Sequence, residues 1–198
     1  MYDWTHLMNS YKKYVKKTDT VLEIGASTVE RTKELSRYCK KLIGLEYFPD
    51  RTPKDFDNVK YIIGDWQNLS KVIKKGSVDL VVSSHVIEHI PNDLEAINET
   101  YEVLKPGGVA LLNTPNRKRL TRAIIELFTG PRKFPYWEHQ REYIKKDLIN
   151  LINMSKFKKF NIIPILFGIN TKYIKIYLKK FPDKLKRYVN YWEIHLFK

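Results

Sequence analysis

The stretch Thr20-Val21-Leu22-Glu23-Ile24-Gly25-Ala26-Ser27-Thr28-Val29-Glu30 decides the fold of this chain. Its apolar segment, Val21–Ile24, is typical of a buried strand, and Gly25 ends it. A charged amphipathic helix is expected to follow at once, over Glu30–Arg37. A strand that turns directly into a helix places backbone N–H groups over the carboxyl edge of a sheet, which predicts a site for a nucleotide-like ligand. Glu23, an acid inside the strand, is expected to face a cationic part of that ligand.

Strand-like and helix-like segments alternate along the rest of the chain. Near-continuous apolar runs predict buried strands, and apolar residues that recur at helical spacing predict helices. The expected strands are Lys41–Glu46, Val59–Ile63, Val78–Ser83, Val109–Asn113, Phe157–Phe167 and Tyr191–Phe197, and the expected helices are Trp4–Lys16, Pro91–Leu104, Arg119–Phe128, Lys145–Met154 and a basic stretch over Thr171–Val189. Repeated strand–helix units predict an α/β fold, with a mostly parallel sheet covered by helices on both faces.

The composition is that of a globular domain. A length of 198 residues and an apolar content of 43% predict a single domain over residues 1–198, with a leading helical segment over residues 1–18. No apolar run approaches the roughly 20 residues that span a bilayer, and the first residues lack the apolar core of a secretory signal. The single Cys39 excludes an internal disulfide and is interpreted as a packing residue. These features predict a cytoplasmic protein.

Positive charge is concentrated in the second part of the chain. Residues 1–116 carry 16 basic and 16 acidic side chains, whereas residues 117–198 carry 20 basic and 6 acidic ones, so the net charge of +14 comes from the second part. Such an excess attracts anionic partners, among them nucleic acid, phosphorylated molecules and membrane surfaces. A well-solvated surface is the alternative interpretation.

Polar residues follow the ends of the first strands, where ligands bind in an open α/β sheet. Glu46 ends the second strand and is placed to accept the hydroxyls of a ribose. Gly64-Asp65-Trp66 follows the third strand, and it offers a hydrogen-bond acceptor and a flat apolar face for an adenine. These residues predict an adenosine derivative as ligand. The alternative is that Glu46 or Asp65 only caps the helix that follows it.

The glycine turn lacks the fingerprint of a dinucleotide site. Its third and sixth positions hold Ser27 and Glu30 in place of glycine, and Glu30 would put negative charge beside a pyrophosphate. The sequence also has no Gly-Lys-Ser/Thr, which argues against a phosphate-binding loop. An adenosine that carries a cationic, non-phosphorylated tail therefore fits better than a dinucleotide.

These motifs resemble those of the class I S-adenosylmethionine-dependent methyltransferases over nearly the whole chain. They occur in the family's order as Val21–Gly25, Glu46, Gly64–Trp66, the stretch DLVVSSHVIEHI over Asp79–Ile90 and the stretch LKPGG over Leu104–Gly108. The resemblance implies a Rossmann-like seven-stranded sheet whose last strand is antiparallel. It also implies S-adenosyl-L-methionine as methyl donor and S-adenosyl-L-homocysteine as product. The expected cofactor-binding residues are Glu23, Gly25, Ala26, Ser27, Glu46, Tyr47, Gly64, Asp65, Trp66, Ser83 and Ser84.

A further segment resembles the small-molecule O-methyltransferases of the ubiquinone-biosynthesis type. It comprises Asn113–Arg117, the basic helix after it, and Glu138–Tyr143. The resemblance implies a small helical lid over residues 115–145 that contacts the methyl acceptor. Basic residues alternate with aromatic ones here, which suits an anionic or amphiphilic small molecule, a membrane surface or single-stranded RNA. The alternative is a helical cap with solvated basic side chains.

Two histidines are candidates for catalysis. Methyl transfer from a sulfonium is an in-line displacement, and holding the two reactants in line can supply much of the rate. A hydroxyl nucleophile must also lose a proton, for which His85 and His139 are the candidate general bases. The other three histidines are interpreted as non-catalytic. No spacing among the five is typical of metal ligands, so no metal is expected.

The first motif departs from the resembled family at Ser27 and Val29, where glycines are usual. Val29 is β-branched and resists positive φ, so ordinary helix geometry is expected there. Three functions stay open. A small-molecule methyltransferase, directed at oxygen, is favoured; the others are an RNA-directed methyltransferase and a non-catalytic module that binds the cofactor or a partner.

Overall fold

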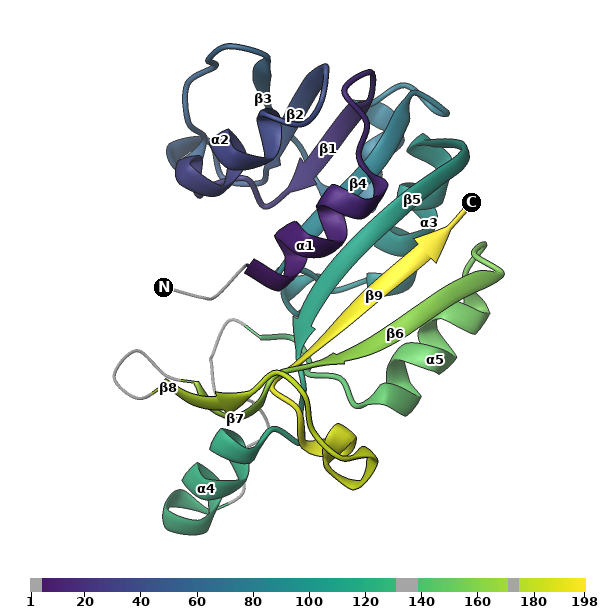
Figure 1. The fold of residues 1–198 in the computed structure, drawn as a ribbon. Helices are drawn as coiled ribbons and strands as arrows, with labels where there is room; N and C mark the ends of the chain where they lie inside the picture. Colours follow the sequence, from purple (N-terminus) through teal and green to yellow (C-terminus); the bar gives the residue numbers. More distant parts are fainter. Residues whose placement is uncertain (1–4, 131–138, 171–174) are drawn as a thin grey trace.

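The computed structural model describes residues 5–130, 139–170 and 175–198. A seven-stranded sheet of order β3-β2-β1-β4-β5-β9-β6 forms its centre (Figure 1). Its strands are β1 (Thr20–Ile24), β2 (Lys41–Glu46), β3 (Val59–Ile63), β4 (Val78–Ser84), β5 (Leu104–Pro115), β6 (Lys159–Ile165) and β9 (Tyr191–Phe197). Strands β1 to β5 are parallel, and β9 is antiparallel to both β5 and β6. The predicted sheet, with its antiparallel last strand, is confirmed.

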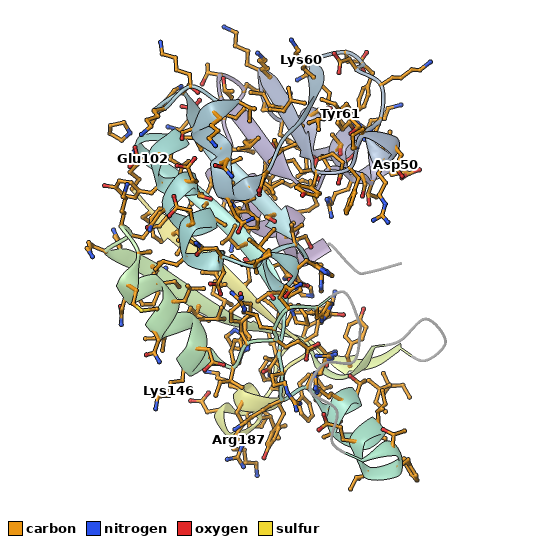
Figure 2. All side chains as sticks on the ribbon, turned by 180° about the vertical axis from the view of Figure 1, so that it is seen from behind. Asp50, Lys60, Tyr61, Glu102, Lys146 and Arg187 are labelled. Carbon is orange, nitrogen blue, oxygen red and sulfur yellow. The ribbon has the colours of Figure 1, made fainter. Side chains whose placement is uncertain are left out.

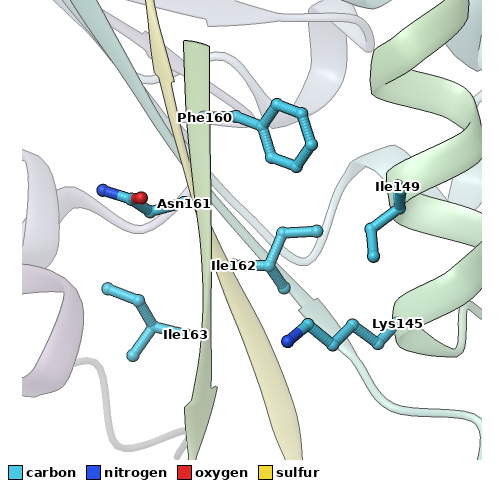
Figure 3. Close-up of a pocket in the computed structure, with 6 residues that line it drawn as sticks. All are labelled: Lys145, Ile149, Phe160, Asn161, Ile162 and Ile163. Atoms are coloured by element: carbon cyan, nitrogen blue, oxygen red, sulfur yellow. The ribbon is translucent and has the colours of Figure 1, made fainter.

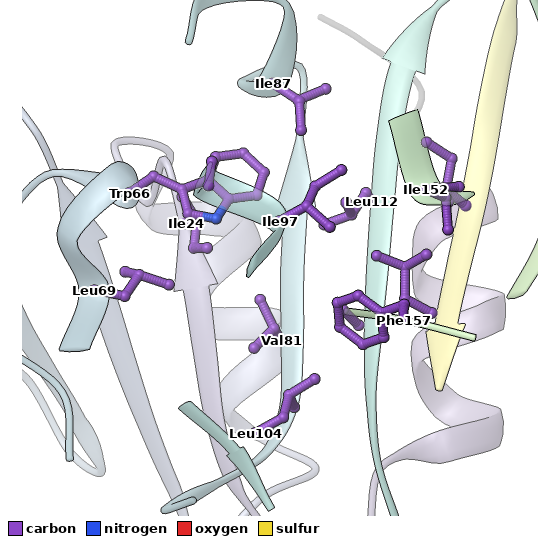
Figure 4. Close-up of a cluster of buried hydrophobic side chains, with 14 of the residues drawn as sticks. Ile24, Trp66, Leu69, Val81, Ile87, Ile97, Leu104, Leu112, Ile152 and Phe157 are labelled. Carbon is purple, nitrogen blue, oxygen red and sulfur yellow. The ribbon is translucent and has the colours of Figure 1, made fainter. Parts of the chain in front are cut away.

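Helices cover both faces of the sheet, as predicted. On one face α1 (Thr5–Tyr14) and α2 (Val29–Ser36) bury Tyr11 and Leu35 against apolar residues of the first strands. The other face is covered by α3 (Asp93–Val103), α5 (Lys145–Met154) and the 3₁₀ helix η2 (Trp66–Lys71). Figure 4 shows part of the apolar cluster beneath these three elements. Because both faces are covered, successive residues of a central strand such as β4 are buried, which explains its continuous apolar sequence.

The predicted helix over Thr171–Val189 is wrong for the part that the structure describes. Lys175–Leu178 forms a strand, β8, which pairs antiparallel with β7 (Phe167–Asn170), and Asp183–Tyr188 forms the 3₁₀ helix η4. The predicted strand Phe157–Phe167 is also divided. Leu166 has a φ of +55°, and this left-handed residue turns the chain from the main sheet into the β7–β8 pair.

Helix α4 (Leu120–Thr129), in the segment predicted as a lid, lies beyond the carboxyl end of β5, beside β7 (Figure 1). Its orientation is unusual, because the charged Arg122 is 2% exposed whereas Leu127 and Phe128 are 81% and 86% exposed. The part of the predicted lid over residues 131–138 lies outside the described residues. Figure 2 shows Lys146 and Arg187 at the periphery of the basic second part of the chain, where both side chains are exposed. In the ranges that the structure describes, every helix is too short or too polar to cross a membrane.

Candidate active site

The ends of β1, β2, β4 and β5 meet at one edge of the sheet. Parallel pairing aligns Ile24 with both Leu45 and Ser83, and it aligns Ser84 with Asn113. The segments that follow these strands therefore emerge side by side, as the sequence predicts. In open α/β sheets this edge is where ligands bind.

Gly25 forms the turn between β1 and α2 in a conformation that favours glycine. Its φ is +76°, and an added Cβ would lie 2.5 Å from Cγ2 of Val86. The N–H groups of Gly25 and Ala26 both donate to the Leu45 carbonyl, with N···O distances of 2.9 and 3.3 Å. Ser27 is exposed, and its φ is not positive. A side chain is therefore tolerated at position 27, where the resembled family usually has glycine.

Glu23 is fully buried at the end of β1, but its carboxylate already has a cationic partner. Arg31 Nε donates to Glu23 Oε1 at 2.6 Å, and Arg31 Nη2 donates to the Gly25 carbonyl at 2.7 Å. The first turn of α2 thus already supplies one cation to Glu23, and a ligand cation, as expected from the sequence, would share this carboxylate with Arg31. The second oxygen, Glu23 Oε2, is buried and has no hydrogen-bond partner among the described residues.

Glu46 and Gly64 are held together at the same edge. The Glu46 side chain is 7% exposed, and its Oε1 accepts a hydrogen bond from the Tyr47 N–H at 3.0 Å. The Glu46 carbonyl accepts from the Gly64 N–H at 3.0 Å. The Tyr47 ring is exposed and meets Phe48 edge-on, with ring centroids 5.0 Å apart. An exposed aromatic pair thus lies directly after the predicted ribose acid.

Trp66 does not offer the flat face for an adenine that the sequence predicts, whereas Asp65 remains partly exposed after β3. Asp65 Oδ1 accepts from the Gln67 N–H at 2.9 Å and so caps η2, which was the alternative interpretation. The Trp66 side chain is 2% exposed and lies in the apolar cluster with Ile97 (Figure 4). Its Nε1 donates to Thr100 Oγ1 at 2.8 Å. Packing the indole against α3 stabilises the fold more than exposing it at the edge of the sheet would, so Trp66 is a core residue.

Strand β4 delivers Ser83, Ser84 and His85 to the edge. Ser83 is 2% exposed, and its Oγ has no hydrogen-bond partner among the described residues. His85 has a φ of +57°, which is uncommon for a residue with a side chain, and its N–H donates to the Asn113 carbonyl at 2.9 Å. Such strained residues cluster at active sites.

A buried carboxylate lies beside the imidazole of His85. Glu88 is fully buried; its Oε1 lies 3.4 Å from His85 Nδ1, and its Oε2 accepts from Thr114 Oγ1 at 3.0 Å. Burial acts to raise the pKa of Glu88, but the contact with His85 outweighs it, so the pKa falls below its usual range. The His85 ring also meets Tyr191 edge-on. An imidazole beside a carboxylate at the end of a strand is an arrangement that suits a general base.

His139 is buried and is held by contacts within its own segment of the chain. The residue is 9% exposed, and its Nδ1 lies 3.1 Å from Glu142 Oε1. Glu142 also accepts hydrogen bonds from Arg119 and Arg122. Burial raises the pKa of Glu142, but His139 and the two arginines outweigh this effect and lower it to about 2. The ring of His139 meets that of His89 edge-on, with centroids 4.7 Å apart.

Three groups near His85 could hold a metal ion. Glu88, His89 and His139 each place one potential ligand atom within 4.8 Å of the others. Imidazole and carboxylate suit zinc and neighbouring transition metals, and the contact of His139 with Glu142 is typical of a ligand's outer partner. Because His139 is distant from the other two along the chain, the sequence argument from ligand spacing could not exclude such a site.

The pocket in Figure 3 lies elsewhere. Its lining residues come only from α5 and β6, at the far edge of the sheet: Lys145, Ile149, Phe160, Asn161, Ile162 and Ile163. None of the strand ends described above contributes to it. It is therefore distinct from the candidate active site.

Comparison with known proteins agrees with this geometry. Residues 22–112 match the family model described as "Methyltransferase domain". A curated protein of Mycolicibacterium smegmatis, described as a "Probable S-adenosylmethionine-dependent methyltransferase", is 30% identical over 152 residues, which are 75% of this chain and 55% of that protein. The chain thus spans about half the length of this relative. A solved S-adenosylmethionine-dependent methyltransferase from Archaeoglobus fulgidus has 18% identity and a TM-score of 0.66, over 98% of this chain and 92% of the other.

Residues 22–112 therefore match a methyltransferase domain, and the fold is that of solved S-adenosylmethionine-dependent methyltransferases. A further solved structure, the phosphoethanolamine N-methyltransferase 2 of Haemonchus contortus with phosphomonomethylethanolamine and S-adenosylhomocysteine, has 18% identity and a TM-score of 0.61, over 81% of this chain and 39% of the other.

Sequence reasoning missed several residues of the site. The sequence places Arg31 in an ordinary charged helix. Only its position in the first turn, where a cation is unfavourable, indicated that it has a specific partner. Glu88 stands in the quoted motif but received no role, and Thr114 received none as a partner for it. His89 was interpreted as structural. The contacts of these residues join segments that are far apart along the chain.

Proposed function

We propose that this methyltransferase domain transfers a methyl group from S-adenosylmethionine to an oxygen atom of a small molecule. The pair formed by His85 and the buried Glu88 supports the proposal most directly. Transfer to a hydroxyl group releases a proton, and an imidazole beside a carboxylate can accept it. The strained backbone of His85 holds this base at the edge where the donor of the family binds.

The edge residues fit a nucleoside with an amino-acid tail. Gly25 packs closely against Val86, and its positive φ turns the backbone from β1 into α2 at this edge. Glu23 Oε2 and Ser83 Oγ are buried polar atoms without partners in the described protein, and a tail ammonium and carboxylate can satisfy such groups. We assign Glu46 to the ribose, the backbone of Gly64 and Asp65 to the adenine, and Ala26, Ser27, Tyr47 and Ser84 to the walls of the site.

The residues divide the chemistry between positioning and proton transfer. S-adenosylmethionine supplies a methyl group on a sulfonium sulfur, and the carbon–sulfur bond breaks as the carbon–oxygen bond to the acceptor forms. His85 takes the proton of the acceptor hydroxyl, and Glu88 stabilises the imidazolium that results. His139, fixed by Glu142, contacts the acceptor from the lid side. Removal of the proton by His85 is expected to contribute about 10²–10⁴-fold to the rate.

We also propose that residues 115–145 form a lid within a single domain over residues 1–198. Exposed Leu127 and Phe128 on α4 suit an acceptor with an apolar part, and the basic residues of the second part suit an anionic one. The Haemonchus contortus neighbour, which holds a small phosphorylated acceptor, supports the small-molecule class. Excising residues 117–143 would not test the lid, because Tyr143 is 3% exposed and belongs to the apolar core.

Two measurements test the proposal. Calorimetry should show binding of S-adenosylmethionine and S-adenosylhomocysteine but not of NAD. A screen of hydroxylated acceptors with methyl-labelled donor should then yield a labelled product. Preferential binding of NAD would contradict the assignment of the donor. Label found only in RNA, with binding that falls steeply as salt rises, would instead identify an RNA-directed enzyme, and donor binding without label in any acceptor would indicate a non-catalytic module.

A further inference from the structure

The side chain of Arg31 folds back from α2 onto the Gly25 turn. It is 11% exposed, and two of its three nitrogens donate to acceptors of this turn, one to Glu23 Oε1 at 2.6 Å and one to the Gly25 carbonyl at 2.7 Å. The guanidinium therefore donates hydrogen bonds to two oxygen atoms at the carboxyl end of β1.

Local helix energetics do not favour a cation at this position. Arg31 is the third residue of α2, and the partial positive charge at a helix N-terminus favours anions there. Burial of a charged side chain is also costly unless it is paired and hydrogen-bonded. The two contacts with Glu23 and Gly25 offset these costs, and they leave Glu23 Oε2 without a partner. Arg31 thus neutralises the charge of Glu23 but donates a hydrogen bond to only one of its two carboxylate oxygens.

A tail ammonium needs the same kind of acceptors. An alkylammonium group has three donors and no acceptor, and it binds carboxylate and carbonyl oxygens. We propose that Arg31 is an internal competitor of the amino-acid tail of the methyl donor, so that it lowers the affinity of this chain for the tail while leaving the nucleoside part unaffected. The inference rests on the proposed function, because it takes S-adenosylmethionine as the ligand of this edge.

Calorimetry with two probes isolates the contribution of the tail. S-adenosylhomocysteine carries the amino-acid tail, whereas 5′-methylthioadenosine has the same nucleoside and thioether without it. In Arg31→Met the affinity for S-adenosylhomocysteine should rise about tenfold, since a hydrogen bond to a charged group typically contributes that much. The affinity for 5′-methylthioadenosine should stay within about twofold of wild type.

Three further variants control for indirect effects. Arg37→Met makes the same change at the end of α2, in an exposed arginine paired with Glu34, and it should leave both affinities unchanged. Arg31→Lys keeps the charge but cannot bond two acceptors with one planar group, so a smaller gain is expected. The double variant Glu23→Gln/Arg31→Met removes both competitor and acid and should lose the gain.

The outcomes separate this inference from the proposed function. If 5′-methylthioadenosine binds but Arg31→Met and Arg31→Lys leave S-adenosylhomocysteine affinity unchanged or lower, the competitor role of Arg31 is wrong and the donor assignment stands. If neither probe binds to the wild type or to any folded variant, both are wrong. Thermal unfolding of each variant establishes that it is folded. If Arg31→Met does not fold, Arg31→Lys is measured in its place.

Discussion

Gly25 and Gly107 have nearly the same φ, +76° and +79°, but different surroundings. A Cβ at Gly25 would lie 2.5 Å from Val86, whereas nothing lies within 4 Å of one at Gly107. Gly107→Ala should therefore cost only backbone strain, about 1 kcal/mol. Gly25→Ala should cost about 1–3 kcal/mol more and abolish binding of S-adenosylhomocysteine. Urea denaturation and calorimetry check both values, and equal destabilisation by the two variants would contradict the steric argument.

His85 combines a strained backbone with an imidazole beside a buried carboxylate. In His85→Gln, turnover should fall about 10²–10⁴-fold while affinity for S-adenosylhomocysteine stays within about twofold, because the base is lost and the donor site remains. His195→Gln is the matched control, since His195 also contacts a buried carboxylate, Glu193, at 2.6 Å. Steady-state rates and calorimetry measure the two effects. Turnover that survives in His85→Gln would remove His85 from the chemistry.

Glu142 makes stability depend on pH in a definite direction. Its pKa is about 2 in the folded protein against an ordinary value of 4.5, so the folded state favours the ionised form. The stabilisation is complete above about pH 4.5 and is lost as the pH falls toward 2. Glu142→Gln should cost on the order of 3 kcal/mol at pH 7, and the difference from wild type should shrink below pH 4.5.

Urea denaturation at pH 7 and pH 3 measures this difference. Glu102→Gln is the control, because Glu102 forms its ion pairs with Lys75 and Lys156 at the surface and should cost less than about 1 kcal/mol. A Glu142→Gln deficit that is the same at both pH values would show that the charge of Glu142 contributes little to stability.

Helix α4 turns its charged residue inward and its apolar residues outward. Arg122 is anchored to Glu142, so Leu127 and Phe128 contribute little to the packed core. The free energy of unfolding of the double variant Leu127→Ser/Phe128→Ser should lie within about 0.5 kcal/mol of the wild-type value, but the variant should turn over an amphiphilic acceptor more slowly. Leu151→Ser, at a buried position of α5, should by contrast cost several kcal/mol. Unchanged turnover in the double variant would exclude α4 from acceptor binding.

The main sheet was predictable because its elements carry their own signal. Buried parallel strands need continuous apolar residues, and the predicted bounds of β2, β3, α5 and β9 agree with the structure. The stretch around β8 was not predictable, since its lysines and apolar residues suit a helix locally and only pairing with β7 makes it a strand. The pairing of Glu23 with Arg31 and the burial of Trp66 likewise depend on tertiary contacts that no local pattern contains.

At the scale of the whole molecule, charge follows the architecture. Residues 1–116, which contain the strand ends of the candidate site, have no net charge, and residues 117–198, with α4 and the β7–β8 pair, carry all of the excess. An anionic acceptor would therefore be attracted toward residues 117–198. Attraction of this kind acts over about a Debye length, so added salt should weaken it.

Within the described part of the chain, strand β6 pairs only with β9, although β9 follows it only after the β7–β8 pair and η4. During synthesis, β6 emerges from the ribosome before the strand that pairs with it, whereas the α5 segment before it can already pack against α3. The hydrogen-bonding edge of β6 has no partner in the main sheet until Tyr191–Phe197 has been translated and inserted beside β5. This interval leaves the nascent chain open to aggregation, and it is the stage at which a chaperone would be of most use.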